Sequence, residues 1–166
     1  RSWRRFCSLG NLSVCFFVSA PLAQAFESTY YVVRHAEKLD GDDPLLTAKG
    51  LRRAAHVSAM LGNVSIDRVY STDTHRTLMT ATPTAASKGV ETELFSTDDL
   101  GGFAAKLKAQ QGTFLIVAHS SSTPDLASLL SGVKIPKLEE TDFEQMFKVV
   151  ITDGTPMLTK MITTFE

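Results

Sequence analysis

Two arginines and two histidines follow short apolar runs of the sequence. Arg34 and His35 come directly after the run 29–33 (TYYVV), His119 ends the run 113–118 (TFLIVA), and Arg76 follows a third run by a few residues. A guanidinium group offers a fork of donors that matches phosphate oxygens. A neutral imidazole is a competent nucleophile and forms covalent intermediates. These residue types predict a site where a phosphoryl group passes to a histidine and then to water.

The segments that must position these side chains alternate between strand and helix patterns. Strand-like runs cover 29–33, 66–70, 90–95 and 113–118, and helical spacing covers 48–61, 74–88, 100–110 and 123–130. Pro83 is expected to kink or restart the second helix, and Asp153-Gly154 predicts a hairpin in the tail. Strands and helices that alternate four times predict one three-layer α/β domain, with a mostly parallel sheet and helices on both faces. Ligands of such sheets bind beyond the carboxyl ends of the strands, where the four side chains fall.

Four segments, in this order, resemble the histidine phosphatase superfamily, whose fold is phosphoglycerate-mutase-like. They are RHAEK at 34–38, LTAKG at 46–50, YSTDTHRTLMTA at 70–81 and VAHSS at 117–121. The resemblance runs from Thr29 to about Gly132. Each segment alone is weak, but four in order, each at a strand end or a helix start, are specific.

The resemblance implies a role for each of the four residues. His35 matches the nucleophile, which becomes phosphorylated on a ring nitrogen. Arg34 and Arg76 match the arginines that hold the phosphoryl oxygens, and His119 matches the second histidine, whose hydrogen bonds and positive charge stabilise the transferring group. Ala36 stands where the best-known members have glycine, and its small side chain still permits close approach. The insertions that set specificity in the family, after the first and third strands, are short here, which implies an open site.

The general acid is not determined by the resemblance. Many members that act on sugar phosphates use a glutamate after the third strand, and the acid phosphatase branch uses an aspartate directly after the second histidine. Here Ser120 follows His119, so the second pattern is absent. Among the carboxylates at 91–99, Glu93 and Asp98 are favoured because they lie nearest the expected strand end. Small members that dephosphorylate protein phosphohistidine also lack an obvious acid, and the assignment stays open.

Residues beside the motifs have two readings each. Glu37 and Lys38 either line the rim of the site or form a solvent-facing ion pair. Ser71 and Thr72 either lend hydroxyl or backbone N–H groups to a phosphate or form a structural turn. Thr47 is read as a helix cap rather than a ligand contact, and His56 and His75 are read as ordinary surface residues of helices.

Composition narrows the partners. The chain has 17 basic and 18 acidic residues and a net charge of −1, which removes the electrostatic case for nucleic acid as the main partner. An apolar fraction of 43% and a charged fraction of 21% are those of an ordinary globular protein. No histidines stand at a metal-ligand spacing, and two arginines beside His35 and His119 would repel a cation. We therefore expect neither a metal nor another cofactor.

The first 25 residues have the pattern of a signal peptide. Three arginines within residues 1–5 precede the apolar stretch 12–20, and Ala23-Gln24-Ala25 is a small-x-small cleavage pattern. We expect cleavage after Ala25, a histidine phosphatase domain at 26–166, a periplasmic or secreted protein, and no membrane contact in the mature form. The alternatives are an N-terminal membrane anchor or a buried strand. Because the sequence begins with arginine rather than methionine, we expect it to be truncated or mis-started.

The sequence and the resemblance together predict an exported, metal-free phosphohydrolase. It would release inorganic phosphate from a phosphomonoester through a phosphohistidine intermediate on His35, and its partner would be a small phosphorylated substrate or a phosphoprotein. The alternatives are a phosphoprotein (phosphohistidine) phosphatase and a non-catalytic phosphate-binding domain. Mutase activity is disfavoured, because a mutase must shield its phosphoenzyme from water and the chain is short for a lid.

Overall fold

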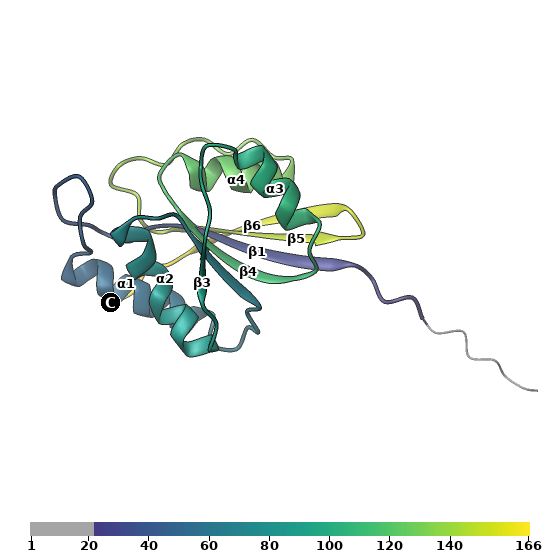
Figure 1. Cartoon of the computed structure of the whole chain (residues 1–166), viewed down its shortest axis with the longest axis horizontal. Helices are drawn as coiled ribbons and strands as arrows, with labels where there is room; N and C mark the ends of the chain where they lie inside the picture. Colours follow the sequence, from purple (N-terminus) through teal and green to yellow (C-terminus); the bar gives the residue numbers. More distant parts are fainter. Residues whose placement is uncertain (1–21) are drawn as a thin grey trace, which may run out of the picture.

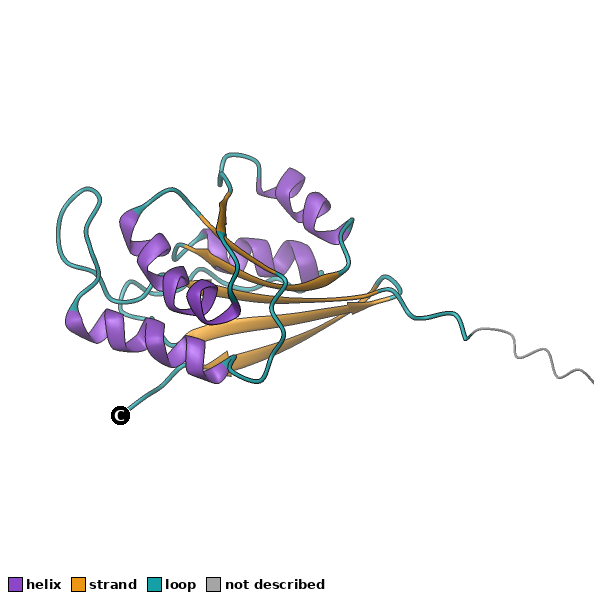
Figure 2. Ribbon diagram, turned by 60° about the horizontal axis from the view of Figure 1, so that its bottom comes forward, coloured by secondary structure: helices purple, strands orange, loops and turns teal. Residues whose placement is uncertain are grey.

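A computed structural model describes residues 22–166 of the chain. Most of the expected signal peptide, and the apolar stretch that defines it, lies outside these residues. The described part is a twisted sheet between two layers of helices, with α1 and α2 on one face and α3 and α4 on the other (Figures 1 and 2). The predicted three-layer α/β domain with a mostly parallel sheet is confirmed.

Strands and helices alternate along the chain as the sequence predicts. Their bounds are β1 (Glu27–Arg34), α1 (Ala48–Met60), β2 (Arg68–Ser71), α2 (His75–Lys88), β3 (Thr92–Leu94), α3 (Leu100–Lys108), β4 (Gly112–Ala118), α4 (Ser122–Ser131), β5 (Gln145–Thr152) and β6 (Thr155–Ile162). The strand order is β3-β2-β4-β1-β5-β6. Neighbours among the first four strands of that order pair in parallel, and the β5–β6 hairpin adds antiparallel to β1.

Alternating side chains of β1 supply both halves of the core. Tyr30 and Val32 pack on the face that carries α3 and α4, whereas Tyr31 and Val33 pack on the face that carries α1 and α2. This two-sided burial is why the first strand reads as a continuous apolar run. Since β1 lies between β4 and β5, it is paired on both sides up to Val33, and its last residue, Arg34, is opposite Ala118 of β4.

Polar side chains and glycines define several helix boundaries. The Thr47 hydroxyl accepts a hydrogen bond from the Gly50 amide at 3.0 Å, so its reading as a cap is confirmed. Asp99 caps α3 in the same way, through the Gly102 amide. Helix α2 ends at Gly89, whose φ of 65° lies in the left-handed region that glycine adopts without strain.

Two local expectations need correction. Helix α2 runs through Pro83 and does not restart there, because a proline removes only one backbone donor and the rest of this packed helix keeps its bonds. Helix α4 has Ser121 as its N-cap and begins at Ser122, one residue earlier than Thr123-Pro124 predicted. Among the helices between residues 22 and 166, none is long and apolar enough to cross a membrane.

Candidate active site

His35 lies at the carboxyl edge of the sheet, where the β1 ladder ends. Its backbone amide donates to the Ala118 carbonyl at 2.9 Å, which extends the pairing with β4 by one residue. Its ring nitrogen Nδ1 lies 2.8 Å from the Ala36 carbonyl oxygen, and the side chain is 3% exposed. A carbonyl oxygen only accepts, so Nδ1 carries the proton and a neutral His35 presents the lone pair of Nε2. That is the form required of a nucleophile.

His119 lies beside His35 at the end of β4. The two imidazole ring centroids are 5.6 Å apart and the rings meet edge to face. The Thr72 hydroxyl oxygen lies 2.9 Å from His119 Nε2, and the Thr77 hydroxyl in turn lies 2.9 Å from that of Thr72. Thr72 thus orients the second histidine from the end of the neighbouring strand β2, and Ser71 donates to the Thr72 carbonyl instead.

Both histidines are neutral at neutral pH. Burial lowers the pKa of His35 to about 3, and the positive charges of Arg34, His119 and Arg76 lower it further against the bond to Ala36. Burial, followed by the charges of Arg76 and Arg34, lowers the pKa of His119 to about 4. The positive charge that the resemblance implies for His119 therefore needs an anion beside it.

Arg34 is buried, with 2% of it exposed. Its Nη1 donates to three backbone carbonyls, those of Glu139, Glu140 and Asp142, at 2.9, 3.1 and 2.8 Å. Its Cζ lies 4.1 Å from the ring centroid of Phe143, and that ring lies 6.0 Å from the ring of His35. Burial lowers the pKa of Arg34, opposed by the charges of Glu140 and Asp142. The carbonyls and the aromatic face compensate a charge that is otherwise costly to bury.

Arg76 reaches the same site from the first turn of α2. Its Nη1 lies 3.8 Å from the Asp43 carboxylate, and its positive charge acts on both histidines. The helix that carries it is tied to the nucleophile loop, because the Thr80 hydroxyl accepts from the Ala36 amide at 2.9 Å. Ala36 is fully buried and packs with Leu46 and Ala54, so a methyl group fits where the best-known family members have glycine.

The two arginines leave donors unused. The Nε atoms of Arg34 and Arg76 are buried and have no hydrogen-bond partner among the described residues. A buried donor without a partner costs folding free energy, so such atoms in a site are typical of places that bind a ligand or water. Two guanidinium donors beside a neutral imidazole nucleophile suit an oxyanion such as a phosphoryl group. Residues 22–166 hold no group of three side chains suited to a metal ion.

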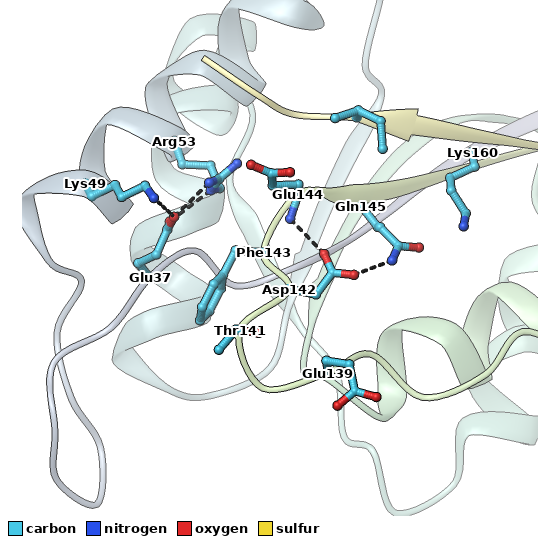
Figure 3. A pocket seen from close by; sticks show the side chains of 11 residues that line it. Glu37, Lys49, Arg53, Glu139, Thr141, Asp142, Phe143, Glu144, Gln145 and Lys160 are labelled. Atoms are coloured by element: carbon cyan, nitrogen blue, oxygen red, sulfur yellow. Dashed lines mark hydrogen bonds and ion pairs between the residues drawn. The ribbon is translucent and has the colours of Figure 1, made fainter. Parts of the chain in front are cut away.

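The nucleophile loop is anchored to α1 through Glu37. Its carboxylate accepts hydrogen bonds from Nη2 and Nε of Arg53 at 2.7 and 2.9 Å. The Lys49 ammonium lies 3.6 Å from the same carboxylate. Glu37 is thus the partner of α1 side chains and not of Lys38. A pocket of about 640 Å³ lies beside this pair, between α1, β6 and residues 139–145. Phe143 forms part of its wall (Figure 3), but His35, Arg76 and His119 do not line it.

The two favoured acids are not joined to this cluster. Glu93 lies on β3 and pairs with Arg68, at the start of β2, at 3.5 Å. Asp98 is exposed, and its recorded hydrogen bond runs from its backbone amide to the Ser96 hydroxyl. The structure therefore brings together His35, His119, Arg34 and Arg76, and records no contact from Glu93 or Asp98 to any of them.

Two parts of the site were missed from the sequence. The segment 138–143 crosses the carboxyl edge of the sheet, with the Leu138 amide bound to the Ser120 carbonyl at 3.1 Å, and it closes one side of a site expected to be open. This segment follows α4, whereas the sequence analysis considered insertions after the first and third strands. Asp43, from the loop after β1, was also missed. Backbone carbonyls and irregular loops leave no periodic pattern in the sequence, so these parts could not be predicted from it. For Asp43, the one indication in the sequence was its position shortly after the RHAEK motif.

Comparisons with known proteins agree with this geometry. The family model of the histidine phosphatase superfamily (branch 1) matches residues 30–101. The chain matches no curated protein sequence. The protein histidine phosphatase SixA, solved with tungstate, superposes with a TM-score of 0.70 at 19% identity, covering 81% of this chain and 97% of that one.

Two further solved structures share the fold. Phosphoserine phosphatase from Entamoeba histolytica has a TM-score of 0.61 at 18% identity, covering 82% of this chain and 98% of that one. Phosphoglycerate mutase from Bacillus anthracis str. Sterne has a TM-score of 0.58 at 17% identity, covering 84% and 94%. The family match over residues 30–101, the motif residues and their meeting at one edge of a phosphoglycerate-mutase-like fold support the histidine phosphatase superfamily.

Proposed function

We propose that the chain is an exported phosphomonoesterase that acts through a phosphohistidine on His35 and requires no metal. The superfamily match and the phosphatases among the similar structures support a phosphatase, and the proposal concerns its route, its substrate class and its location. The observation that carries the proposal is the pairing of a neutral, Nε2-presenting His35 with two arginines whose buried Nε atoms have no partner.

The geometry supports a two-step reaction. The Nε2 lone pair of His35 attacks phosphorus and the leaving oxygen departs with the electrons of its bond to phosphorus. Water then attacks phosphorus, and the electrons of the P–N bond return to His35. Arg34 and Arg76 hold the equatorial oxygens in both steps, and the anion beside His119 raises the pKa of that imidazole so that it can donate a proton in a hydrogen bond. Removing one such donor typically slows catalysis by about 10²–10³-fold.

The test combines an activity with a trapped intermediate. The wild-type protein should hydrolyse p-nitrophenyl phosphate in the presence of EDTA, and His35→Ala should abolish this activity. His56→Ala, at a half-buried histidine of α1 whose ring lies against Phe165, is the matched control and should remain active. Rapid quenching at high pH should trap phosphate on His35, stable to base and labile to acid as a P–N bond is. A label on serine or aspartate, or an activity that EDTA removes, would contradict the proposal.

Export has its own test. The leader pattern at 1–25 motivates the expectation that the protein, produced with its leader in a Gram-negative host, is recovered outside the cytoplasm and begins at Phe26. N-terminal sequencing reads the outcome directly. An intact leader on soluble cytoplasmic protein would contradict export and leave the catalytic proposal standing.

A second candidate is a phosphatase of protein phosphohistidine. It is favoured by the absence of any recorded contact from Glu93 or Asp98 to the site, because a phosphohistidine has a better leaving group than an alkyl ester and needs a proton donor less. The likeness to SixA concerns the fold and adds no more than motivation. A panel of phosphorylated metabolites and phosphohistidine peptides separates the candidates by the rate of phosphate release.

A further inference from the structure

The loop between β1 and α1 is closed at its two ends by backbone pairing. Lys38 and Leu46 form an isolated bridge, and the Leu39 amide donates to the Leu45 carbonyl at 2.9 Å. The loop begins three residues after the nucleophile and projects beyond the carboxyl ends of the strands, beside the start of α2 (Figure 1). The residues at its tip therefore lie beside the helix start that carries Arg76.

Asp43, in this loop, faces α2. Its carboxylate accepts from the His75 amide at 2.9 Å and lies 2.8 Å from His75 Nδ1. It also lies 3.8 Å from Nη1 of Arg76. The Asp43 side chain is 48% exposed, whereas Arg76 Nε is buried and faces no partner. Arg76 thus has one buried donor without a partner, Nε, and another, Nη1, near the Asp43 carboxylate.

Cleavage of an alkyl phosphate needs a proton donor close to the leaving oxygen. This oxygen departs as a basic alkoxide, and a positioned acid accelerates such a step by about 10²–10⁴-fold. Glu93 is paired with Arg68, and Asp98 makes no recorded contact with the cluster. Two described carboxylates approach the phosphate-binding arginines: Glu140 lies 3.7 Å from Nη2 of Arg34, and Asp43 lies 3.8 Å from Nη1 of Arg76. Of these two, Asp43 lies in the loop that directly follows the nucleophile.

We propose that Asp43 is the general acid of this site and that the substrates are alkyl phosphomonoesters. The inference rests on the proposed phosphohistidine route and specifies its missing proton donor.

The proton balance closes over the two steps. In the first, the P–N bond to His35 forms, the bond from phosphorus to the alkyl oxygen breaks, and the Asp43 carboxyl proton moves to that oxygen, so an alcohol leaves. In the second, the Asp43 carboxylate takes a proton from the attacking water while the P–N bond breaks. Inorganic phosphate leaves, and Asp43 is protonated again as at the start.

The experiment compares leaving groups. Wild type, Asp43→Asn and Asp43→Ser are assayed on glycerol phosphate, an alkyl ester, and on p-nitrophenyl phosphate, whose leaving group needs little protonation. Asn preserves shape, and Ser keeps an oxygen that caps the His75 amide. We expect both variants to lose about 100-fold in kcat on the alkyl ester and to retain most of the aryl activity. Asp42→Asn, the exposed neighbour in the same loop, is the matched control and should retain both.

Each other outcome has a defined reading. Equal losses on both esters in both variants would overturn the role of Asp43 as proton donor, because a binding or folding defect does not distinguish leaving groups. Full alkyl activity in Asp43→Asn would overturn it as well, as would an equal loss in Asp42→Asn. These outcomes leave the phosphohistidine route intact if His35 is still labelled. Absence of both activities and of the label in wild type would contradict the proposed function itself.

Discussion

The hydroxyl oxygen of Thr72 lies 2.9 Å from Nε2 of His119, so the residues that directly follow two neighbouring strands meet at the site. Thr72 is buried, and its hydroxyl also meets that of Thr77. The second histidine is therefore oriented by a side chain that has no charge and undergoes no chemistry. Its rotamer depends on a single polar contact.

Thr72→Val should lower kcat with little change in KM. The isosteric side chain removes the bond to His119, whereas the Thr77 hydroxyl keeps the Thr72 carbonyl as an acceptor. Loss of a buried hydrogen bond costs about 1–3 kcal/mol. If this appears in the barrier, the rate falls by about tenfold or more. Steady-state kinetics on an aryl phosphate measures it, with Thr72→Ser as the rescue and Thr82→Val, on the exposed side of α2, as the control. An unchanged kcat in Thr72→Val would show that the contact does not orient His119.

Arg34→Lys should inactivate the protein and destabilise it. An ammonium group keeps the charge but loses the fork, and it cannot satisfy the carbonyls of Glu139, Glu140 and Asp142 together while reaching a phosphoryl group. We expect at least about a 100-fold loss in kcat/KM and a lower unfolding temperature. The exposed Arg52→Lys is the matched control. A stable, active Arg34→Lys protein would contradict the arrangement of residues 139–142.

Gly50→Ala and Gly101→Ala should act in opposite directions. A Cβ at Gly50, in the first turn of α1, would overlap the carbonyl oxygen of Glu37, two residues after the nucleophile. A Cβ at Gly101, in α3, would meet only the Asp99 carboxylate at 3.8 Å. Thermal unfolding should therefore show a clear destabilisation for Gly50→Ala, and a gain of up to about 1 kcal/mol for Gly101→Ala from helix propensity. Two changes of the same sign would contradict the close packing of α1 on the nucleophile loop.

Stability should fall on acidification through the two histidines. Their pKa values are about 3 for His35 and about 4 for His119 in the folded protein, against 6.5 ordinarily. Below pH 6.5 the unfolded chain binds more protons at these residues than the folded one, so unfolding becomes easier as the pH falls, and the effect levels off for His119 below about 4 and for His35 below about 3. The unfolding temperature measured from pH 8 to pH 4 should show this. The double variant His35→Gln/His119→Gln should show a weaker slope over this range, and an equal slope would contradict the buried, neutral state.

The convergence of the four site residues was predictable, but their supports were not. Arg34, His35 and His119 each follow an apolar strand, and the carboxyl ends of parallel strands share an edge, so strand patterns were sufficient to bring them together. The partners of Arg34 are backbone carbonyls, which every residue possesses and no sequence pattern marks. The contact of Asp43 with α2 depends on the path of an irregular loop.

The surroundings of Glu93 depend on strand register. The sequence placed it near the end of the third strand but did not specify its cross-strand neighbour. Tyr70 is opposite Glu93 in the β2–β3 pairing, and the carboxylate reaches back to Arg68 at the start of β2. A difference of one or two residues along a strand decides which end of the sheet a long side chain approaches.

The bonds of Arg34 also affect how the protein comes into being. They join the end of the first strand to carbonyls more than a hundred residues later in the chain. During synthesis the sheet can begin to form around β1 long before residues 139–142 leave the ribosome, and until then the guanidinium has no shell of oxygens around it. Competence for phosphate chemistry is thus acquired at the end of folding, in one late closure. Damage to the final third of the chain would leave a protein that has most of its secondary structure and no working centre.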